Sequence, residues 1–358
     1  MKSKEKTTVM VTMADIAKLA GVSRTTTSFV LNGKELELRI SDQTRNRVLS
    51  AAKELGYRKN EIARAVATGK NFVIGILDRE HSIEQRARIM EGALKEANPN
   101  GYFIKLLLHP YEEDVLDAAK NCIEQRLAGL IVMLPSRIEM DVLKAELDIH
   151  HIPIVTVDDD VSIMGITNVL TNDAQGMKLA LDHLVALGHR EIVLLSGNTT
   201  NSLGNLRERT FKQLMFELGI PVRQENLLSD NGKIERVEAL IIDRFTVEQG
   251  RPTAILSASG DFEAALAIRA LRSIGVCVPK HVSVVGYADL QPAVLIDPPL
   301  TTIRQPFEEL GRRAFKELLS EIEGGHCMDH QGLRHPRLVD TELIVRKSTA
   351  QVFQIFES

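Results

Sequence analysis

Apolar residues from position 72 onward fall into short, nearly continuous runs. The runs are FVIGIL (72–77), YFIKLLL (102–108), GLIVML (129–134), PIVTV (153–157), EIVLLS (191–196), TAILSA (253–258) and VSVVGY (282–287). Between them, residues 84–97, 112–126, 174–187, 202–218 and 260–274 carry helical patterns. Apolar strands that alternate with helices predict parallel sheets covered on both faces. Seven or more such units predict two doubly wound lobes.

A different pattern precedes them, in which three short helices are predicted. Thr12 can cap a first helix, MADIAKLA, with Asp15 at the position of a capping box. After the turn at Gly21-Val22, Ser23 can cap a second helix, which ends near Asn32-Gly33. Helix, short glycine-containing turn and helix is the layout of a helix-turn-helix motif.

A third predicted helix runs from Ser41 to Gly56 and buries Val48, Ala52 and Leu55. Three short helices of this kind make a minimal core.

The second predicted helix contains three threonines and a serine between Arg24 and Phe29. A recognition helix in the major groove of DNA needs short hydrogen-bonding side chains on its outer face. Arg24 can reach guanine, and the exposed hydroxyls can bond phosphates or bases. We interpret Thr27 instead as a packing residue.

Charge supports a nucleic-acid partner for this segment. Residues 1–70 hold 14 Lys and Arg against 7 Asp and Glu, whereas the remainder holds 30 against 41. A basic module on an acidic body is the electrostatic footprint of polyanion binding, although a solvated basic tail would carry similar charge.

Other chemistry is excluded or disfavoured. No G-x-S-x-G, P-loop, G-x-G-x-x-G or HExxH motif occurs, so we expect no enzyme and no cofactor. His326, Cys327, His330 and His335 lack zinc-finger spacing, and we expect no metal site. The three cysteines lack CxxC spacing and are expected to be reduced and buried. The start lacks a signal-peptide pattern and no run of eighteen apolar residues occurs, so we expect a cytoplasmic protein with no membrane partner.

Ligands of open α/β sheets bind beyond the carboxyl ends of the strands. Position alone therefore selects the residues that follow the apolar runs as candidates for one cleft. They are Asp78, Pro135-Ser136, Asp158 to Asp160, Gly197-Asn198, Ser259 to Asp261 and Ala288-Asp289.

The segments VTMADIAKLAGVSRTTTSFVLNG and RVLSAAKELGY resemble the headpiece of the LacI/GalR family of bacterial transcription regulators. The longer loop NGKELELRIS is similar to the fructose- and sucrose-repressor branch. HLVALGHREIVLLSG, VPKHVSVVGYADL, PPLTTIRQPFEELG and DTELIVRKST resemble the effector-binding core, so the resemblance covers about residues 11 to 349. It implies a three-helix helix-turn-helix headpiece (11–59), a hinge (60–70) and a two-lobed, periplasmic-binding-protein-like α/β core (71–349).

The resemblance also implies which residues meet DNA. Arg24 and Thr25 occupy the two base-reading positions, and Phe29 stands where the family often has arginine. The segment NEIARAVATGK matches the hinge helix that enters the minor groove, with Val66 as a smaller wedge than the usual leucine and Lys59 in place of the common proline. The full set of implied DNA contacts is Thr12, Ser23, Arg24, Thr25, Thr26, Ser28, Asn32, Tyr57, Asn60, Ala63 and Val66.

For the core, RERTF matches the family segment whose arginine, here Arg207, contacts the effector. Ala288 stands where members that bind simple sugars usually have aspartate, which disfavours an unmodified sugar. The implied effector is a sugar, sugar phosphate or related polyol. Its expected contacts are Asp78, Ser136, Asp158, Arg207, Asp261 and Asp289.

The sequence thus predicts a transcriptional repressor that binds a palindromic operator as a homodimer assembled through its core. A solute-binding transport protein would explain the two lobes but has no use for residues 11–70. A sugar-processing enzyme would need a catalytic constellation that the sequence lacks.

Overall fold

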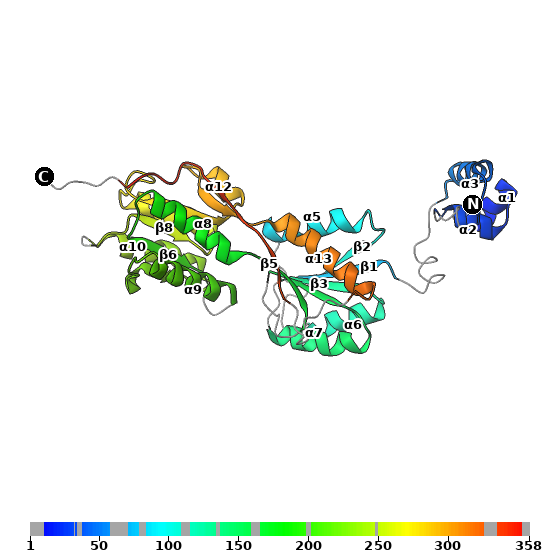
Figure 1. Cartoon of the computed structure of the whole chain (residues 1–358), viewed down its shortest axis with the longest axis horizontal. Coiled ribbons are helices and arrows are strands. Elements are labelled where there is room, and N and C mark those ends of the chain that lie inside the picture. Colours follow the sequence, from blue (N-terminus) through cyan, green and yellow to red (C-terminus); the bar gives the residue numbers. More distant parts are fainter. Residues whose placement is uncertain are drawn as a thin grey trace, which may run out of the picture. The chain divides into compact units, whose positions relative to one another are not determined.

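The computed structural model describes residues 11–31, 33, 38–57, 71–78, 84–108, 115–133, 137–158, 165–197, 202–247, 250–325 and 335–352. The chain divides into two compact units, Met1–Lys70 and Asn71–Ser358 (Figure 1). We call the described part of the first unit the headpiece and the second unit the core.

The headpiece consists of helices α1 (Met13–Ala20), α2 (Arg24–Leu31) and α3 (Asp42–Glu54). Its buried centre is made of small and branched apolar side chains from all three helices: Ile16, Ala20, Val30, Val48 and Ala51. The sequence predicts that the third helix buries Val48, Ala52 and Leu55. Val48 is buried, whereas Ala52 and Leu55 are half-buried and pack against the same core, and Ala51 on this face of the helix is buried as well.

The core contains two parallel sheets, which confirms the two doubly wound lobes. The N-lobe sheet has the order β11-β5-β4-β3-β1-β2. Its strands are β1 (Val73–Asp78), β2 (Phe103–Leu108), β3 (Gly129–Met133), β4 (Ile154–Val157), β5 (Thr167–Thr171) and β11 (Arg337–Val339).

The C-lobe sheet repeats this order as β12-β10-β9-β8-β6-β7. Its strands are β6 (Ile192–Ser196), β7 (Leu227–Ser229), β8 (Ala254–Ser257), β9 (Ser283–Ala288), β10 (Thr301–Arg304) and β12 (Glu342–Ile344). Only the pairing of β10 with β12 is antiparallel among the described strands.

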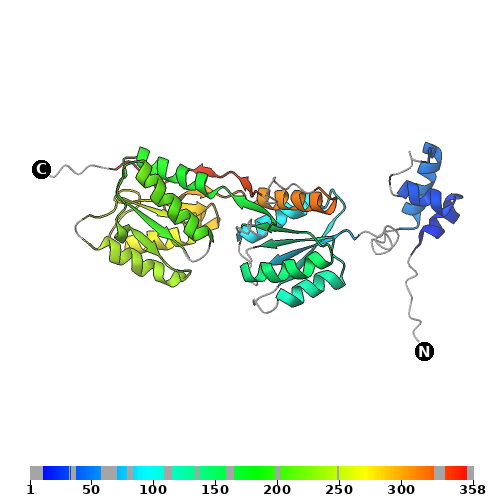
Figure 2. The ribbon, with the colours of Figure 1, turned by 60° about the horizontal axis from the view of Figure 1, so that its bottom comes forward.

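Helices cover both faces of each sheet, as the turned view in Figure 2 shows. In the N-lobe, α5 (Glu84–Ala97) and α13 (Phe307–Ile322) cover one face, while α6 (Val115–Glu124) and α7 (Arg137–Ile149) cover the other. In the C-lobe, α8 (Asp173–Ala186) and α9 (Ser202–Glu217) lie opposite α10 (Val237–Phe245), α11 (Asp261–Ser273) and α12 (Gln291–Leu295). This double coverage explains why the strands are apolar on both faces.

The described chain passes between the lobes three times: from β5 to α8, from β10 to α13, and from β11 to β12. The C-terminal part of the sequence therefore contributes to both lobes, and the lobes are not two consecutive halves of the chain.

Two further expectations concern single residues and membranes. Cys122 is a buried free thiol, but Cys277 is exposed, so the expectation of buried thiols is wrong at that position. Cys277 lies in the connection that follows α11, outside both faces of the C-lobe sheet. Within the described residues, no helix combines the length and apolar character needed to cross a bilayer.

Candidate functional site

The start of α2 is fixed by a hydroxyl cap. Ser23 Oγ accepts the backbone N–H of Thr26 at 3.0 Å and shares a hydrogen bond with the Thr26 hydroxyl at 2.9 Å. Thr27 is completely buried and its hydroxyl donates to the Ser23 carbonyl oxygen at 3.1 Å. The interpretation of Thr27 as a packing residue is confirmed.

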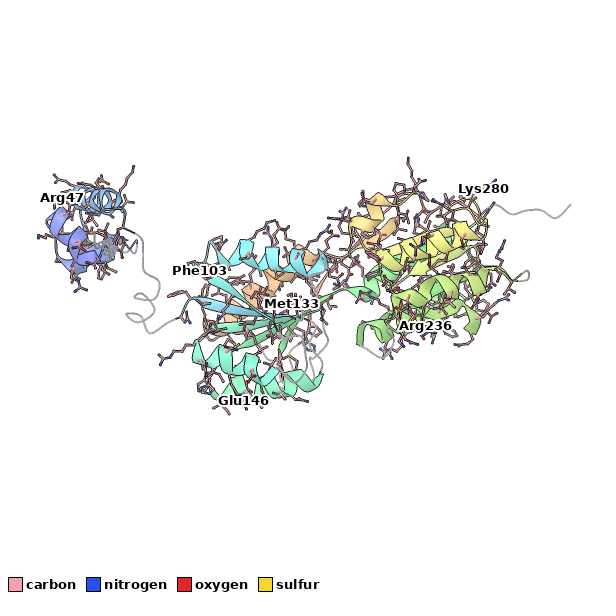
Figure 3. The ribbon with its side chains drawn as sticks, turned by 180° about the vertical axis from the view of Figure 1, so that it is seen from behind. Arg47, Phe103, Met133, Glu146, Arg236 and Lys280 are labelled. Carbon is pink, nitrogen blue, oxygen red and sulfur yellow. The ribbon has the colours of Figure 1, made fainter. Side chains whose placement is uncertain are left out.

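Arg24 and Thr25 are exposed at this capped end of α2. Helix N-termini carry unpaired N–H groups that favour phosphate, so the geometry presents two polar side chains beside an anion-binding end. α3 adds exposed cations to the headpiece surface, including Arg47, which is labelled in Figure 3.

The other predicted DNA residues have structural partners or lie outside the described residues. The Asp15 carboxylate accepts both the backbone N–H and the hydroxyl of Thr12, at 2.8 and 2.7 Å. Ser28 is half-buried on α2, and Tyr57 packs against the headpiece core. Asn32, Asn60, Ala63 and Val66 lie outside the described residues.

In the core, Arg207 is the centre of a compact polar group. Its Nε and Nη2 both lie 3.0 Å from Asp173 Oδ1, and its Nη1 donates to the Ala258 carbonyl oxygen at 2.8 Å. The guanidinium also stacks on the Tyr287 ring at 4.2 Å, and the Tyr287 hydroxyl donates to Asp173 Oδ1 at 2.7 Å. We call these residues the Arg207 cluster: Arg207, Asp173, Tyr287 and the carbonyl of Ala258.

The pKa values of Arg207 and Tyr287 are both raised within the Arg207 cluster. Burial works to lower the pKa of Arg207, but the charges of Asp173, Tyr287 and Asp158 and the hydrogen bond to Asp173 together outweigh burial and raise that pKa above its ordinary value. Burial raises the pKa of the Tyr287 phenol well above its ordinary value. Arg207 is therefore a permanent cation and Tyr287 a neutral hydrogen-bond donor.

Two predicted residues lie on the N-lobe side. Asp78 is buried and pairs with Arg86 at 2.5 Å. Asp158 accepts the Thr171 hydroxyl at 3.3 Å, and Thr171 in turn accepts the side-chain amide of Gln305 at 3.1 Å. The negative charge of Asp158 also raises the pKa of Arg207. Asp158 follows an N-lobe strand and Arg207 lies on a C-lobe helix, so Asp158 and Arg207 interact electrostatically across the lobes. Ser136 lies outside the described residues.

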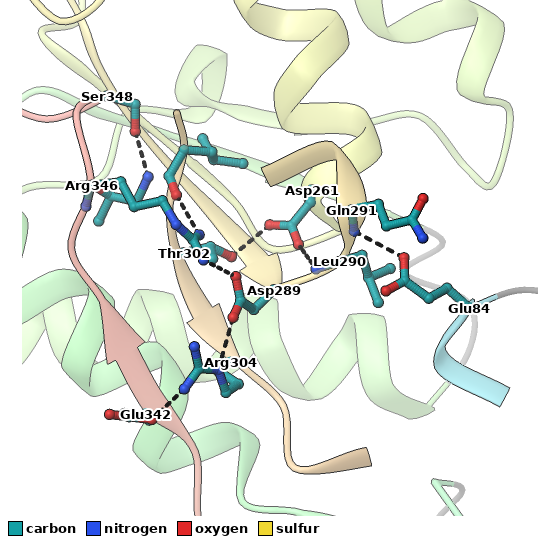
Figure 4. Close-up of polar contacts among 12 residues, drawn as sticks. Glu84, Asp261, Asp289, Leu290, Gln291, Thr302, Arg304, Glu342, Arg346 and Ser348 are labelled. Atoms are coloured by element: carbon teal, nitrogen blue, oxygen red, sulfur yellow. Dashed lines mark hydrogen bonds and ion pairs between the residues drawn. The ribbon is translucent and has the colours of Figure 1, made fainter. Parts of the chain in front are cut away.

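Asp261 and Asp289 are engaged by the protein itself, as Figure 4 shows. Asp261 accepts the Thr302 hydroxyl at 2.5 Å and the Leu290 backbone N–H at 2.7 Å. Asp289 binds Arg304 Nε at 2.8 Å and Arg346 Nη2 at 2.6 Å. Burial raises the pKa of Asp261. Both residues hold the turn after β9, and their contact with an effector stays a prediction.

The same turn is contacted from the N-lobe. Glu84 Oε2 accepts the backbone N–H of Gln291 at 2.9 Å (Figure 4). Arg88 donates to the Asp289 carbonyl oxygen at 3.2 Å. Glu84 and Arg88 are themselves paired at 2.5 Å on α5. We call these contacts between α5 and residues 289–291 the inter-lobe latch.

Sequence reasoning missed Asp173 and the Glu84–Arg88 pair. Asp173 follows β5, a strand that the apolar runs did not include, so no strand end pointed to it. Glu84 and Arg88 look like an ordinary i,i+4 pair on a solvated helix face. Only the assembled lobes bring them to residues 289–291.

Residues 12–60 match the profile of bacterial regulatory proteins of the lacI family, and residues 181–349 match a periplasmic binding protein-like domain. The HTH-type transcriptional repressor PurR of Erwinia tasmaniensis is 33% identical over 324 residues, which cover 87% of this chain and 91% of the relative. The chain belongs to the lacI family. PurR of Vibrio parahaemolyticus is 31% identical over 316 residues, covering 88% and 92% of the two chains.

A crystal structure of the lac repressor dimer bound to operator and an anti-inducer superposes on this family member with a TM-score of 0.77. The two chains are 27% identical, and the match covers 95% of this chain and 99% of the other. The protein is accordingly a DNA-binding transcriptional repressor with an effector-binding core, and not an enzyme. Within the described residues, no group of His, Cys, Asp and Glu could hold a metal ion.

Proposed function

We propose that this repressor binds a palindromic operator as a homodimer and releases or tightens it in response to a carbohydrate-related effector at the Arg207 cluster. The proposed division is a headpiece at 11–59, a hinge at 60–70 and a core at 71–349, in a cytoplasmic protein. The observation that carries the effector site is Arg207, a cation held by Asp173 beside the first passage between the lobes.

Exposed apolar side chains support the homodimer. β2, where Phe103 is labelled in Figure 3, is the outer strand of its sheet. Its Phe103, Leu106 and Leu108 are 52, 45 and 57% exposed. Val294 and Leu295 on α12 are 58 and 80% exposed. Clustered apolar residues on an edge strand are typical of association surfaces. A second headpiece would also supply the second half-site contact that a single recognition helix needs.

The headpiece loop and the full-length relatives point to different branches of the family. The loop NGKELELRIS supports a fructose- or sucrose-repressor origin of the headpiece, whereas the full-length relatives above are PurR repressors. We therefore propose a carbohydrate effector from the headpiece branch and treat sugars, sugar phosphates and polyols as the first panel to screen.

The test combines ligand screening with operator binding. A ligand that stabilises the core in a thermal-shift screen is added to the protein on fluorescently labelled operator. Because Arg207→Ala would leave the Asp173 carboxylate buried without its cation, at a cost of about 3–5 kcal/mol, the double variant Arg207→Met with Asp173→Asn is the better probe. We expect it to bind operator normally and to lose the response to ligand.

Arg209→Met is the matched control, because Arg209 lies on the same helix and is exposed. It should keep both operator binding and the ligand response. A double variant that responds to the ligand as the wild type does would show that the effector binds away from the Arg207 cluster.

A further inference from the structure

The cation of Arg207 is already neutralised within the protein. Two of its nitrogen atoms lie 3.0 Å from the same oxygen of Asp173, and the two side chains are only 11 and 1% exposed. An arginine paired with a buried carboxylate presents N–H donors without a net positive charge. A ligand phosphate would have to compete with Asp173 for that cation.

One carboxylate oxygen of Asp173 has no hydrogen-bond partner among the described residues. Its Oδ1 takes all the donors from Arg207 and Tyr287, whereas its Oδ2 is buried and has no hydrogen-bond partner among the described residues. A buried acceptor without a partner is costly and favours an incoming donor. A ligand hydroxyl can donate to a carboxylate, and an ionised phosphate oxygen cannot.

A second carboxylate near the Arg207 cluster, that of Asp158, strengthens this preference. Asp158 acts on Arg207 from the N-lobe. A phosphate monoester brings a charge of about −1.5 to −2 at neutral pH. Its approach to the carboxylates of Asp158 and Asp173 would be repulsive.

We propose that the effector is an uncharged polyhydroxyl compound, and that Asp173 is the residue that makes the Arg207 cluster select hydroxyl groups over phosphate groups. This inference rests on the proposed effector site and narrows its ligand class. It also changes the expectation drawn from Ala288. The carboxylate that is missing at position 288 has a counterpart at position 173, which comes from a different element of the fold.

Inorganic phosphate is the probe, since it tests the charge preference before the natural effector is identified. Its binding is measured by thermal shift and calorimetry in a phosphate-free buffer at constant ionic strength. The variants are Asp173→Asn, Arg207→Met, the combination of both, and Arg209→Met as the control on the same helix. Asp173→Asn keeps the size of the side chain and removes its charge.

We expect phosphate to shift the melting temperature of the wild type no more than that of the combined variant, in which neither charge is left unpaired. Asp173→Asn should bind phosphate about tenfold or more tightly than the wild type, because the guanidinium regains its net charge. The combined variant should lose this gain, and Arg209→Met should match the wild type.

Wild-type binding of phosphate that disappears in the combined variant would overturn the proposal, and this comparison holds even if Asp173→Asn alone folds poorly. A well-folded Asp173→Asn variant without any gain would overturn it as well. Neither result touches the proposed effector site, because phosphate held by Arg207 would still be a ligand of the cluster. The proposed effector site is refuted by a different result, in which operator binding still responds to the ligand after Arg207 has been replaced.

Discussion

Helices α5 and α13 approach each other so closely that a single methyl group should disturb the N-lobe. A Cβ atom at Gly92 would lie 1.9 Å from the Glu308 carbonyl oxygen, and one at Gly311 would lie 1.8 Å from the Ile89 carbonyl oxygen. Real Cβ atoms essentially never come within 3.0 Å of another heavy atom. Both obstacles are backbone atoms, so no rotamer change relieves the overlap and the helices must separate by about 1 Å.

The magnitude for Gly92→Ala follows from two opposing effects. Overpacking of a buried contact costs about 3 kcal/mol when backbone must move. The better helix propensity of alanine returns about 1 kcal/mol. We expect a net loss of about 2 kcal/mol in the free energy of unfolding of the core, which corresponds to a melting temperature lower by about 3–4 °C.

Calorimetry of Gly92→Ala and of the exposed neighbour Glu91→Ala measures this loss, and the neighbour should change the stability by less than about 0.5 kcal/mol. The displaced α5 also carries Glu84 and Arg88, so the inter-lobe latch should loosen and hydrogen exchange at the Gln291 amide should accelerate. A Gly92→Ala core as stable as the wild type would refute the close helix contact and the reasoning built on it.

Three further predictions test other parts of the molecule. Arg24→Ala should relax sequence choice by about 1–3 kcal/mol at one base pair per half-site, whereas Arg47→Ala should weaken binding evenly on specific and random DNA; equal losses for both variants would argue against base reading by Arg24. Burial raises the pKa of Glu263, so the folded state holds that proton more strongly than the unfolded state and stability falls as pH rises from the ordinary value of 4.5 through the higher folded value. Glu263→Gln should therefore melt higher than the wild type at pH 7 and lose this advantage below about pH 4; an advantage that persists in acid would contradict the assignment. Glu84→Ala should accelerate hydrogen exchange at the Gln291 amide, and an unchanged exchange rate would contradict the inter-lobe latch.

The lobes could be predicted because their signal is local. Every predicted apolar run except that of the exposed edge strand β2 lies on a strand that is buried on both faces, and each helix between them follows its own periodicity. β5 was not predicted because its local sequence does not resemble that of a buried strand. Its sequence TNVLT is half polar, yet every residue in it is buried, since Asn168 and Thr156 bond each other across neighbouring strands. A buried polar pair is indistinguishable from a loop until the strands are assembled.

The candidate site was predictable only in part. Arg207 was found through its sequence motif, and Asp78 and Asp158 through their positions at strand ends. Asp173, the main partner of Arg207, lies 34 residues earlier in the chain and meets Arg207 only because α8 packs against α9. Strand-end position places Asp289 at the same edge but gives no sign of the two arginines that occupy it.

The three passages between the lobes are hydrogen-bonded to one another, which gives the site a physical route to the rest of the molecule. Gln305 on the second passage donates to Thr171 on the first, and Asn172 on the first donates to Asp340 on the third. Asp173 is the next residue along the first passage and is also the partner of Arg207. A ligand that pulls on Arg207 therefore acts on a residue of the connection itself, where a small rotation moves both lobes. Since coupling between two binding equilibria is reciprocal, operator binding that favours one arrangement of the passages must change effector affinity by the same factor.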